Sequence, residues 1–228
     1  MIYAIGDIHG ELAKLDAVLA QITLTSDDTI VFIGDYVDRG PDSFGVINRV
    51  RELQESWNVV TLRGNHEQMM LDAREYYTGT PKGKSLDTDF ALMWFHNGAD
   101  RTLASYPKNG APHWYERIPE DHWRFLENTE MERTIGPYRF VHAGVLPMGV
   151  KWEDPALDPR LWIREPFLLS KENFGHVVVF GHTPLRQPLI EANKIGIDTG
   201  AAYGRQLTAV SLDPGRPYGV ADVRVIQS

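Results

Sequence analysis

The sequence is 228 residues long, with 43% hydrophobic and 24% charged residues. These proportions are typical of a globular protein and exclude a disordered chain, and the length predicts one domain, residues 1–228, that carries an insertion. The formal net charge is −8 and there is no run of Lys or Arg, which argues against a broad nucleic-acid surface and means that any phosphate site must be local.

The first third of the chain alternates short apolar runs with amphipathic segments. MIYAI (1–5) predicts a buried strand, and apolar residues at helical spacing over 11–22 predict the helix after it. The pattern recurs in TIVFI (29–33), which precedes a helix with Ser43 as its expected N-cap, and in NVVTL (58–62), which precedes a third helix. Three repeats of strand and helix predict a parallel βαβαβ core with right-handed crossovers.

The segment from about 78 to 134 has a different character. It opens with the loop signal TGTPKGKS and continues with tryptophans and histidines that show no strand alternation, so we predict a mainly helical insertion. Closely spaced apolar runs return after Gly136, without long helices between them, and predict an antiparallel or mixed second sheet. The expected fold class is α/β, with two mixed sheets packed face to face and helices outside.

Five loops at strand ends share one property. GDIHG, GDYVDRG, RGNHE, VHAG and FGHT each place polar side chains beside glycine where an apolar run stops. In open α/β sheets, ligands bind at the carboxyl ends of the strands, so these loops are expected to meet in one crevice. They carry Asp7, His9, Asp35, Asp38, Arg39, Arg63, Asn65, His66, His142 and His182.

The donor types point to metal chemistry. Carboxylate, amide and imidazole together suit Mn, Fe or Zn, and a carboxylate can bridge two cations. Two dications held roughly 3.5–4 Å apart form a clamp for in-line displacement at phosphorus. If Asp35 bridges, one metal is completed by Asp7 and His9, and the other by Asn65, His142 and His182.

Taken alone, GDYVDRG is hard to explain as structure, because a plain turn needs only the glycines and Pro41, but each of the other loops also has a structural explanation. GDIHG could be a plain turn, HAG or GHT could hold a buried histidine, and GNHE could be a helix start capped by Asn65. The ligands Asp7, Asp35 and Asn65 of the first three loops lie 28 and 30 residues apart, roughly one strand and helix each, so each unit returns a ligand to one edge. The coincidence favours the metal site. The other histidines lack this setting and are expected to be surface or packing residues: His96, His113, His122 and His176.

The five motifs, in this order, resemble the phosphoprotein phosphatase branch of the calcineurin-like metallophosphoesterases, in particular its small bacterial serine/threonine phosphatases. The resemblance runs from Ile5 to His182, with IDTGA near Asp198 also similar, and is loose in the insertion. It implies the same two ligand sets, with Asp35 shared. The longer C-terminal motif of the eukaryotic members is not found here, so their toxin sensitivity and regulatory subunits are not implied; Tyr203 in DTGAAYG could still approach the site.

The resemblance also implies roles for residues that do not bind metal. His66 matches the residue that protonates the leaving group, and Asp38 matches its charge partner. Arg39 and Arg63 match residues that clamp the phosphate, and Arg164 in LWIRE is expected to supply a third clamp.

These inferences predict a phosphomonoesterase that acts on phosphoserine or phosphothreonine in proteins, with two divalent ions, manganese first and iron or zinc as alternatives. A metal-held hydroxide is the expected nucleophile. Two alternatives remain: a symmetrical dinucleoside-tetraphosphate hydrolase, or a broad-specificity phosphatase that includes phosphotyrosine. The related hydrolases commonly have a small residue where VDRG has Asp38, which favours the protein phosphatase. An inactive scaffold would usually have lost a ligand, the acid or a clamp, and none is missing here.

The surroundings of the protein are also constrained. The absence of cysteine excludes thiolate metal sites and fits a reducing cytosol. No signal-like or membrane-spanning run is present, so we expect a cytoplasmic protein without a membrane or nucleic-acid partner. A phosphoprotein or phosphopeptide is the expected partner, and a monomer is favoured.

Overall fold

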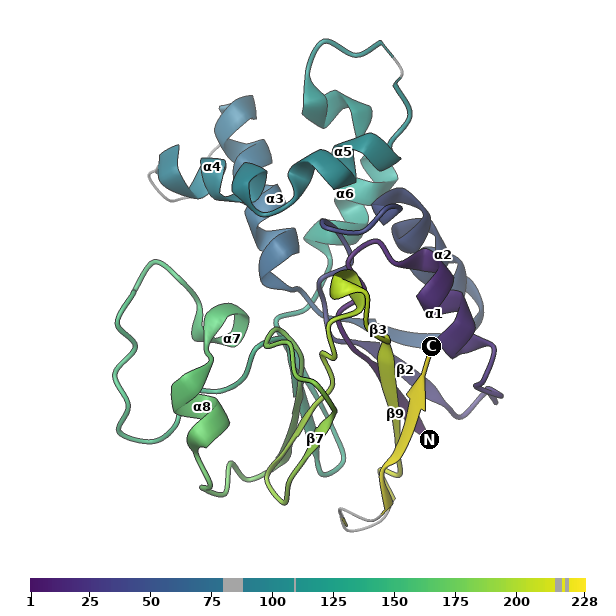
Figure 1. Ribbon diagram of the computed structural model, residues 1–228, viewed down its shortest axis with the longest axis vertical. Helices are drawn as coiled ribbons and strands as arrows, with labels where there is room; N and C mark the ends of the chain where they lie inside the picture. The colour runs from purple at the N-terminus through teal and green to yellow at the C-terminus, as the bar shows by residue number, and fades with distance from the viewer. Residues whose placement is uncertain (80–87, 109, 216–218, 220–221) are drawn as a thin grey trace.

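The computed structural model describes residues 1–79, 88–108, 110–215, 219 and 222–228. It contains two five-stranded sheets with helices on their outer faces (Figure 1). Both sheets are mixed, as predicted. Among the described residues, no helix combines the length and the apolar character needed to cross a membrane.

The first sheet is built on the predicted parallel core. Its strand order is β10-β9-β1-β2-β3, with β1, β2 and β3 parallel and β9 antiparallel to both β1 and β10. All four residues of β2 are buried, as expected for a central strand covered on both faces. The strands are β1 (Ile2–Ile5), β2 (Thr29–Phe32), β3 (Asn58–Thr61), β9 (Thr208–Leu212) and β10 (Arg224–Gln227).

Three helices follow the three parallel strands, which confirms the predicted alternation: α1 (Leu12–Leu19), α2 (Ser43–Ser56) and α3 (Asn65–Thr78). The expected caps are wrong by one residue. Asp42, not Ser43, caps α2 by accepting a hydrogen bond from the Gly45 amide at 2.7 Å. This leaves the Ser43 hydroxyl free to bind elsewhere. Gly64, not Asn65, is the N-cap of α3.

The segment predicted as a helical insertion contains α4 (Thr88–His96), α5 (Ala99–Ser105), a 3₁₀ turn η1 (Trp114–Arg117) and α6 (Glu120–Glu127). These helices gather with α3 at one end of the molecule (Figure 1). The second sheet begins at Glu132, earlier than the sequence pattern suggests. Most of the loop TGTPKGKS lies outside the described residues.

The second sheet has the strand order β4-β5-β6-β8-β7, with β5, β6 and β8 parallel. Its strands are β4 (Glu132–Ile135), β5 (Tyr138–Val141), β6 (Val177–Phe180), β7 (Leu189–Ile190) and β8 (Lys194–Gly196). The short helices α7 (Pro159–Trp162) and α8 (Glu165–Leu169) lie on its outer side (Figure 1). A second 3₁₀ turn, η2 (Ala201–Tyr203), precedes β9.

Apolar side chains from the inner faces of both sheets form the central core. Val31 and Ile33 of the first sheet cluster with Phe140 and Val179 of the second, and all four are fully buried. Such burial typically contributes about 1.5–3 kcal/mol per large side chain. This core fixes the two sheets against each other, and with them the loops at the strand ends.

Candidate metal centre

The predicted site residues follow the carboxyl ends of five strands. Asp7 and His9 lie after β1, Asp35 after β2, Asn65 after β3, His142 directly after β5 and His182 after β6. All six side chains are buried. The strand ends of both sheets therefore bring these side chains to one place, although they span 175 residues of sequence.

The backbone of these loops is unusual. Of the described residues other than glycine, the only ones with positive φ are His9, Asp35, Asp38, Arg39 and His182, with φ between 47° and 71°. This left-handed conformation is costly for a residue with a side chain and concentrates at functional sites. The strain therefore falls in three of the five motif loops: GDIHG, GDYVDRG and FGHT.

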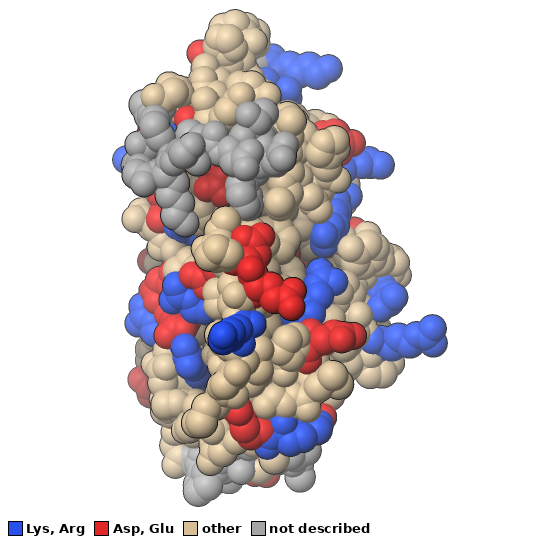
Figure 2. Space-filling view, turned by 90° about the vertical axis from the view of Figure 1, so that its left-hand side faces the viewer, with Lys and Arg blue, Asp and Glu red and all other residues tan. Residues whose placement is uncertain are grey.

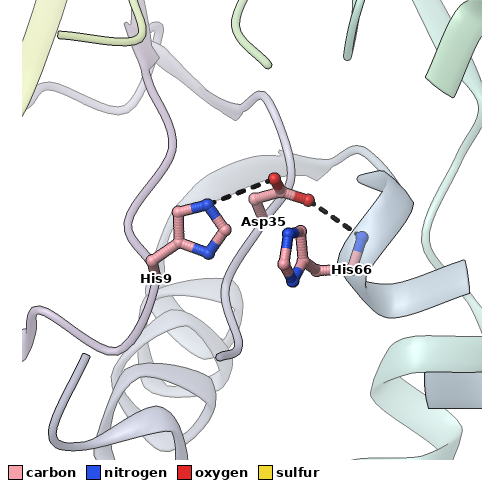
Figure 3. Close-up of side chains that lie close together, drawn as sticks. All are labelled: His9, Asp35 and His66. Carbon is pink, nitrogen blue, oxygen red and sulfur yellow. Dashed lines mark hydrogen bonds and ion pairs between the residues drawn. The ribbon is translucent and has the colours of Figure 1, made fainter. Parts of the chain in front are cut away.

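Asp35 lies at the centre of the site (Figure 3). Its Oδ2 is 3.3 Å from Nε2 of His9, and its Oδ1 is 3.5 Å from Nε2 of His142. The two oxygens thus face two groups of possible ligands: Asp35 with His9 and His66, and Asp35 with His142 and His182. Burial opposes the charge of Asp35, but the surrounding histidines hold its pKa far below the usual range.

On the second side, the Asn65 amide oxygen faces two imidazole rings. It lies 3.0 Å from Nε2 of His142 and 2.9 Å from Nδ1 of His182. His142 Nδ1 is 3.1 Å from the Ile33 carbonyl, which can only accept, so the ring proton belongs on Nδ1. The Nε2 lone pair then faces the Asn65 oxygen, an arrangement that a cation between the two atoms would stabilise.

Backbone contacts orient the rings in the way that metal ligands require. His9 Nδ1 donates to the Val37 carbonyl at 2.8 Å, which leaves Nε2 as a lone-pair donor. Burial lowers the pKa of His9 to about 3 and also lowers the pKa of His142 and His182. The three imidazoles are therefore neutral at pH 7, the form that binds metal.

The surroundings of Asp7 indicate most clearly that this site suits a cation. Its Oδ2 accepts from the His182 amide at 2.8 Å, but its Oδ1 is buried without a hydrogen-bond partner. Burial, together with the nearby carboxylates of Asp198 and Asp35, raises the pKa of Asp7 well above its usual value. A buried cluster of carboxylates is costly unless a cation neutralises it, so this donor set fits divalent metal.

The loops of the site approach one another closely, which Gly181 permits and Glu67 stabilises. A Cβ on Gly181 would lie 1.9 Å from Asp7 Oδ1, so only glycine fits there. Glu67, which the sequence pattern places only in the first turn of a helix, accepts hydrogen bonds from the amides of Gly64, Asp35 and Tyr36 at 2.8–2.9 Å. Its carboxylate thereby ties the Asp35 loop to the Asn65 loop.

His66 and Asp38 form a buried pair beside Asp35. His66 Nδ1 donates to Asp38 Oδ2 at 2.6 Å, and His66 Nε2 is buried without a hydrogen-bond partner. Burial lowers the pKa of His66, but the charge of Asp35 and the bond to Asp38 outweigh it and raise that pKa overall. The arrangement holds an imidazole that can carry a proton on an uncommitted Nε2.

The three predicted arginines lie in different surroundings. Arg39 Nη1 donates to His9 Nε2 at 2.6 Å, and Arg164 Nε donates to His182 Nε2 at 3.2 Å, so both reach predicted metal ligands. Arg63 does not. Its guanidinium donates to the Leu126 and Glu127 carbonyls at the end of α6, and to the side chains of two further residues, Gln68 and Thr129.

The structure also adds residues that the sequence analysis does not find. Trp94 and Thr102 donate to Asp38 from α4 and α5. The Tyr203 ring is 55% exposed and lies 5.6 Å from the Arg39 guanidinium, so it does approach the site. Of the histidines assigned to packing, His122 is buried, with hydrogen bonds to Tyr106 and Asn48. No local motif marks the contacts of Trp94 and Thr102, because they join residues more than 50 positions apart.

A sandwich of two mixed sheets, with Asp, Asn and His gathered around the Asp35 carboxylate at the strand ends, defines a metal-dependent phosphoesterase. The chain belongs to the calcineurin-like phosphoesterase family, whose model matches residues 1–209. It is a hydrolase of that family, and the resemblance seen in the motifs is confirmed.

Several known proteins are similar over most of the chain. Serine/threonine-protein phosphatase 1 of Salmonella typhimurium is 31% identical over 91% of this chain and 89% of its own length. The asymmetrical bis(5′-nucleosyl)-tetraphosphatase PrpE of Bacillus velezensis is 29% identical over 96% and 95%. A crystal structure of a candidate diadenosine tetraphosphatase superposes with a TM-score of 0.65 at 22% identity, covering 99% of this chain and 92% of that one.

Proposed function

We propose that the chain hydrolyses phosphoserine and phosphothreonine in proteins as a metal-dependent phosphomonoesterase. The observation that carries this proposal is the buried His66–Asp38 pair, with an uncommitted imidazole Nε2 beside the residues that could hold metal. A serine alkoxide is a poor leaving group and needs a proton, which such an imidazole can donate. The 31% identity to a bacterial serine/threonine phosphatase supports the same reading.

The residues that would hold metal divide around Asp35. Asp7 and His9 would complete one site and Asn65, with two histidines, the other: His142 and His182. Manganese is the cation that we expect, with iron or zinc as alternatives, because the donors mix carboxylate, amide and imidazole. When bound, a pair of divalent ions supplies an activated water and positive charge for the phosphoryl oxygens.

The side chains of the protein would then bind and orient the substrate. Arg39 and Arg164 already direct N–H groups toward the site and would hold phosphoryl oxygens through forked hydrogen bonds. His66 would give the proton at Nε2 to the departing oxygen, while Asp38 keeps the ring charged and oriented. Arg63 would join the clamp only if its guanidinium left the end of α6.

Dinucleoside tetraphosphate hydrolysis is the second candidate. The tetraphosphatase PrpE relative, at 29% identity over nearly the whole chain, supports it directly. A symmetrical tetraphosphatase from Pectobacterium atrosepticum is 41% identical, but over only 37% of this chain. We favour the phosphomonoesterase because Asp38 and its bond to His66 are present. Phosphotyrosine stays an alternative, since the clamp contacts the phosphoryl group and not its carrier.

The test is a comparison of substrates on the manganese-loaded protein. Phosphoserine, phosphothreonine and phosphotyrosine peptides of one sequence, and a dinucleoside tetraphosphate, are assayed for kcat/KM. We expect the phosphoserine and phosphothreonine peptides to be the best substrates. A kcat/KM at least tenfold higher for the dinucleoside tetraphosphate would overturn the proposal in favour of the second candidate.

A further inference from the structure

The carboxylate of Asp38 is held from the helical segment as well as from His66. Trp94 Nε1 of α4 lies 3.1 Å from both carboxylate oxygens, and Thr102 Oγ1 of α5 donates to Oδ1 at 2.7 Å. Asp38, Trp94 and Thr102 are all fully buried. Bonds to a buried charge are stronger than neutral ones, so these contacts limit where the carboxylate can lie.

Thr102 fixes the backbone of Asp38 as well as its side chain. The Asp38 amide donates to Thr102 Oγ1 at 2.8 Å, while the same hydroxyl donates to the Asp38 carboxylate. The Ser43 hydroxyl does not cap α2. Its Oγ lies 3.1 Å from Thr102 Oγ1 and 3.2 Å from the Asp38 amide nitrogen. The ring of bonds supports the left-handed φ of 71° at Asp38.

Gly98, at the N-terminus of α5, completes the contact. A Cβ at this position would lie 2.9 Å from the Arg39 amide nitrogen and 3.3 Å from Cβ of Asp38. Its own φ of 112° is also unfavourable for a side chain. The start of α5 therefore packs directly on the Asp38–Arg39 backbone. The helical segment thus lies directly against the Asp38–His66 pair.

We propose that Trp94 and Thr102 are positioning residues for the general acid, acting on His66 through Asp38. This inference rests on the proposed function, because it assigns His66 the proton transfer. With three side-chain donors on one carboxylate, Oδ2 keeps a fixed direction toward His66 Nδ1, and the ring keeps Nε2 directed at the leaving oxygen. Loss of either donor frees the carboxylate to rotate, and the imidazole with it.

The kinetic test compares two leaving groups on metal-loaded full-length protein. Thr102→Val removes one donor with little change of shape, Trp94→Phe removes another together with part of a buried ring, and Thr102→Ser retains the hydroxyl. We expect the first two to lower kcat on a phosphoserine peptide about tenfold and kcat on p-nitrophenyl phosphate much less, because nitrophenolate leaves with little help from an acid. Thr102→Ser should keep kcat on both substrates close to the wild-type values, because the hydroxyl is retained.

The matched control is Trp123→Phe, in the same helical segment. Trp123 is also buried, but its Nε1 donates to the Tyr115 carbonyl and not to Asp38. This variant should leave the ratio of the two kcat values unchanged. Equal losses on both substrates in Trp94→Phe and Thr102→Val, or the same selective loss in Trp123→Phe, would overturn the proposal.

A second measurement does not depend on turnover. In ¹⁵N-histidine-labelled protein, the Nδ1 proton of His66 should be protected from exchange and shifted downfield by its short bond to Asp38. Trp94→Phe and Thr102→Val should reduce the protection of this proton, and Trp123→Phe should not. Unchanged protection in folded Trp94→Phe and Thr102→Val would contradict the proposal.

Failure of the proposed function gives a different pattern. Wild-type protein that cleaves p-nitrophenyl phosphate but not phosphoserine peptides would disprove the protein-phosphatase assignment. The positioning role is then tested on phenyl phosphate against p-nitrophenyl phosphate, two esters with poor and good leaving groups. Selective losses on phenyl phosphate would support the role, and equal losses on the two esters would reject it.

Discussion

At the scale of single residues, His66 combines a short bond to Asp38 with a buried Nε2 that has no partner. If Nε2 protonates the leaving oxygen, the loss of kcat on replacing His66 depends on how much the leaving group needs a proton. We predict that His66→Asn lowers kcat about 10²–10⁴-fold on a phosphoserine peptide and far less on p-nitrophenyl phosphate. Asp38→Asn should show the same bias more mildly.

The measurement for His66 is kcat on both substrates at saturating metal, with the metal content of each variant determined. His66 also lies within the group formed by His9 and Asp35, so it could instead serve the metals. Equal losses on the two substrates, accompanied by lost metal, would assign it to that role.

Arg63 gives a second prediction at this scale. Its N–H groups bind the Leu126 and Glu127 carbonyls, Thr129 and Gln68. We therefore expect Arg63→Ala to lower the free energy of unfolding by about 1–3 kcal/mol, because several partly buried acceptors lose a charged donor. Urea unfolding measures the change. Arg133→Ala, which breaks an exposed pair with Glu130, is the matched control and should cost at most about 1 kcal/mol.

The same variant distinguishes the two roles considered for Arg63. A large fall in kcat/KM with no change in stability would contradict the contacts with α6 and favour the phosphate clamp. A fall in stability with kcat/KM retained would mean that Arg63 holds α6 in place and does not bind the phosphate.

At the scale of elements, sequence reasoning succeeds where chain topology carries the information. Parallel strands joined by helices must return to one edge of the sheet, so Asp7, Asp35 and Asn65 could be brought together from spacing alone. The second sheet carries a weaker signal, because its strands β7 and β8 have only two and three residues. The start of β4 before Gly136 is missed for a different reason: its sequence, ERTI, is mostly polar and partly exposed, so it forms no apolar run.

Contacts between distant elements leave no such signal. Trp94 and Thr102 lie 56 and 64 positions from Asp38, on helices whose sequence indicates only burial. Arg63 is predicted from its motif, but the direction of its side chain depends on where α6 ends. Side-chain direction is set by packing between elements, and one sequence does not show it.

The contact between α2 and α6 makes stability depend on pH. His122 of α6 is nearly fully buried, accepts from the Tyr106 hydroxyl and donates to Asn48 of α2. Burial lowers the pKa of His122 to about 4 in the folded protein, against 6.5 for an ordinary histidine. Below pH 6.5 the unfolded chain therefore binds a proton that the folded chain does not. Stability from this group is complete above pH 6.5 and is lost as the pH falls toward 4.

We predict that the free energy of unfolding falls more between pH 7.5 and pH 5 in the wild type than in His122→Gln, by roughly 1–2 kcal/mol. Urea unfolding at both pH values measures the difference. His176→Gln, at an exposed histidine, should retain the wild-type difference. An equal pH dependence in wild type and His122→Gln would show that His122 does not contribute to the acid sensitivity.

At the scale of the whole molecule, the global charge and the site have opposite requirements. The chain carries −8, yet its substrate would be a phosphate dianion. Lys and Arg are interspersed with Asp and Glu over the face shown in Figure 2, so that face offers no broad attraction for anions. Positive charge at the site must come from the arginines and from bound cations, which act over short distances at physiological salt.

Asp35 lies where it could be shared by two metal sites, and we expect activity to depend on both sites. Its two carboxylate oxygens face His9 on one side and His142 on the other. Replacing Asp35 should therefore weaken metal binding at both sites. Replacing Asp7, which is expected to bind only one of the two metals, should weaken mainly that site.

The direct measurement is the metal content per chain, determined with kcat on p-nitrophenyl phosphate, for wild type, Asp7→Asn and Asp35→Asn after equilibration with manganese. We predict two ions in the wild type, a larger loss of ions and of kcat in Asp35→Asn than in Asp7→Asn, and no turnover in excess chelator. Full turnover in chelator, or wild-type metal content and kcat in Asp35→Asn, would contradict a shared role of Asp35 in two metal sites.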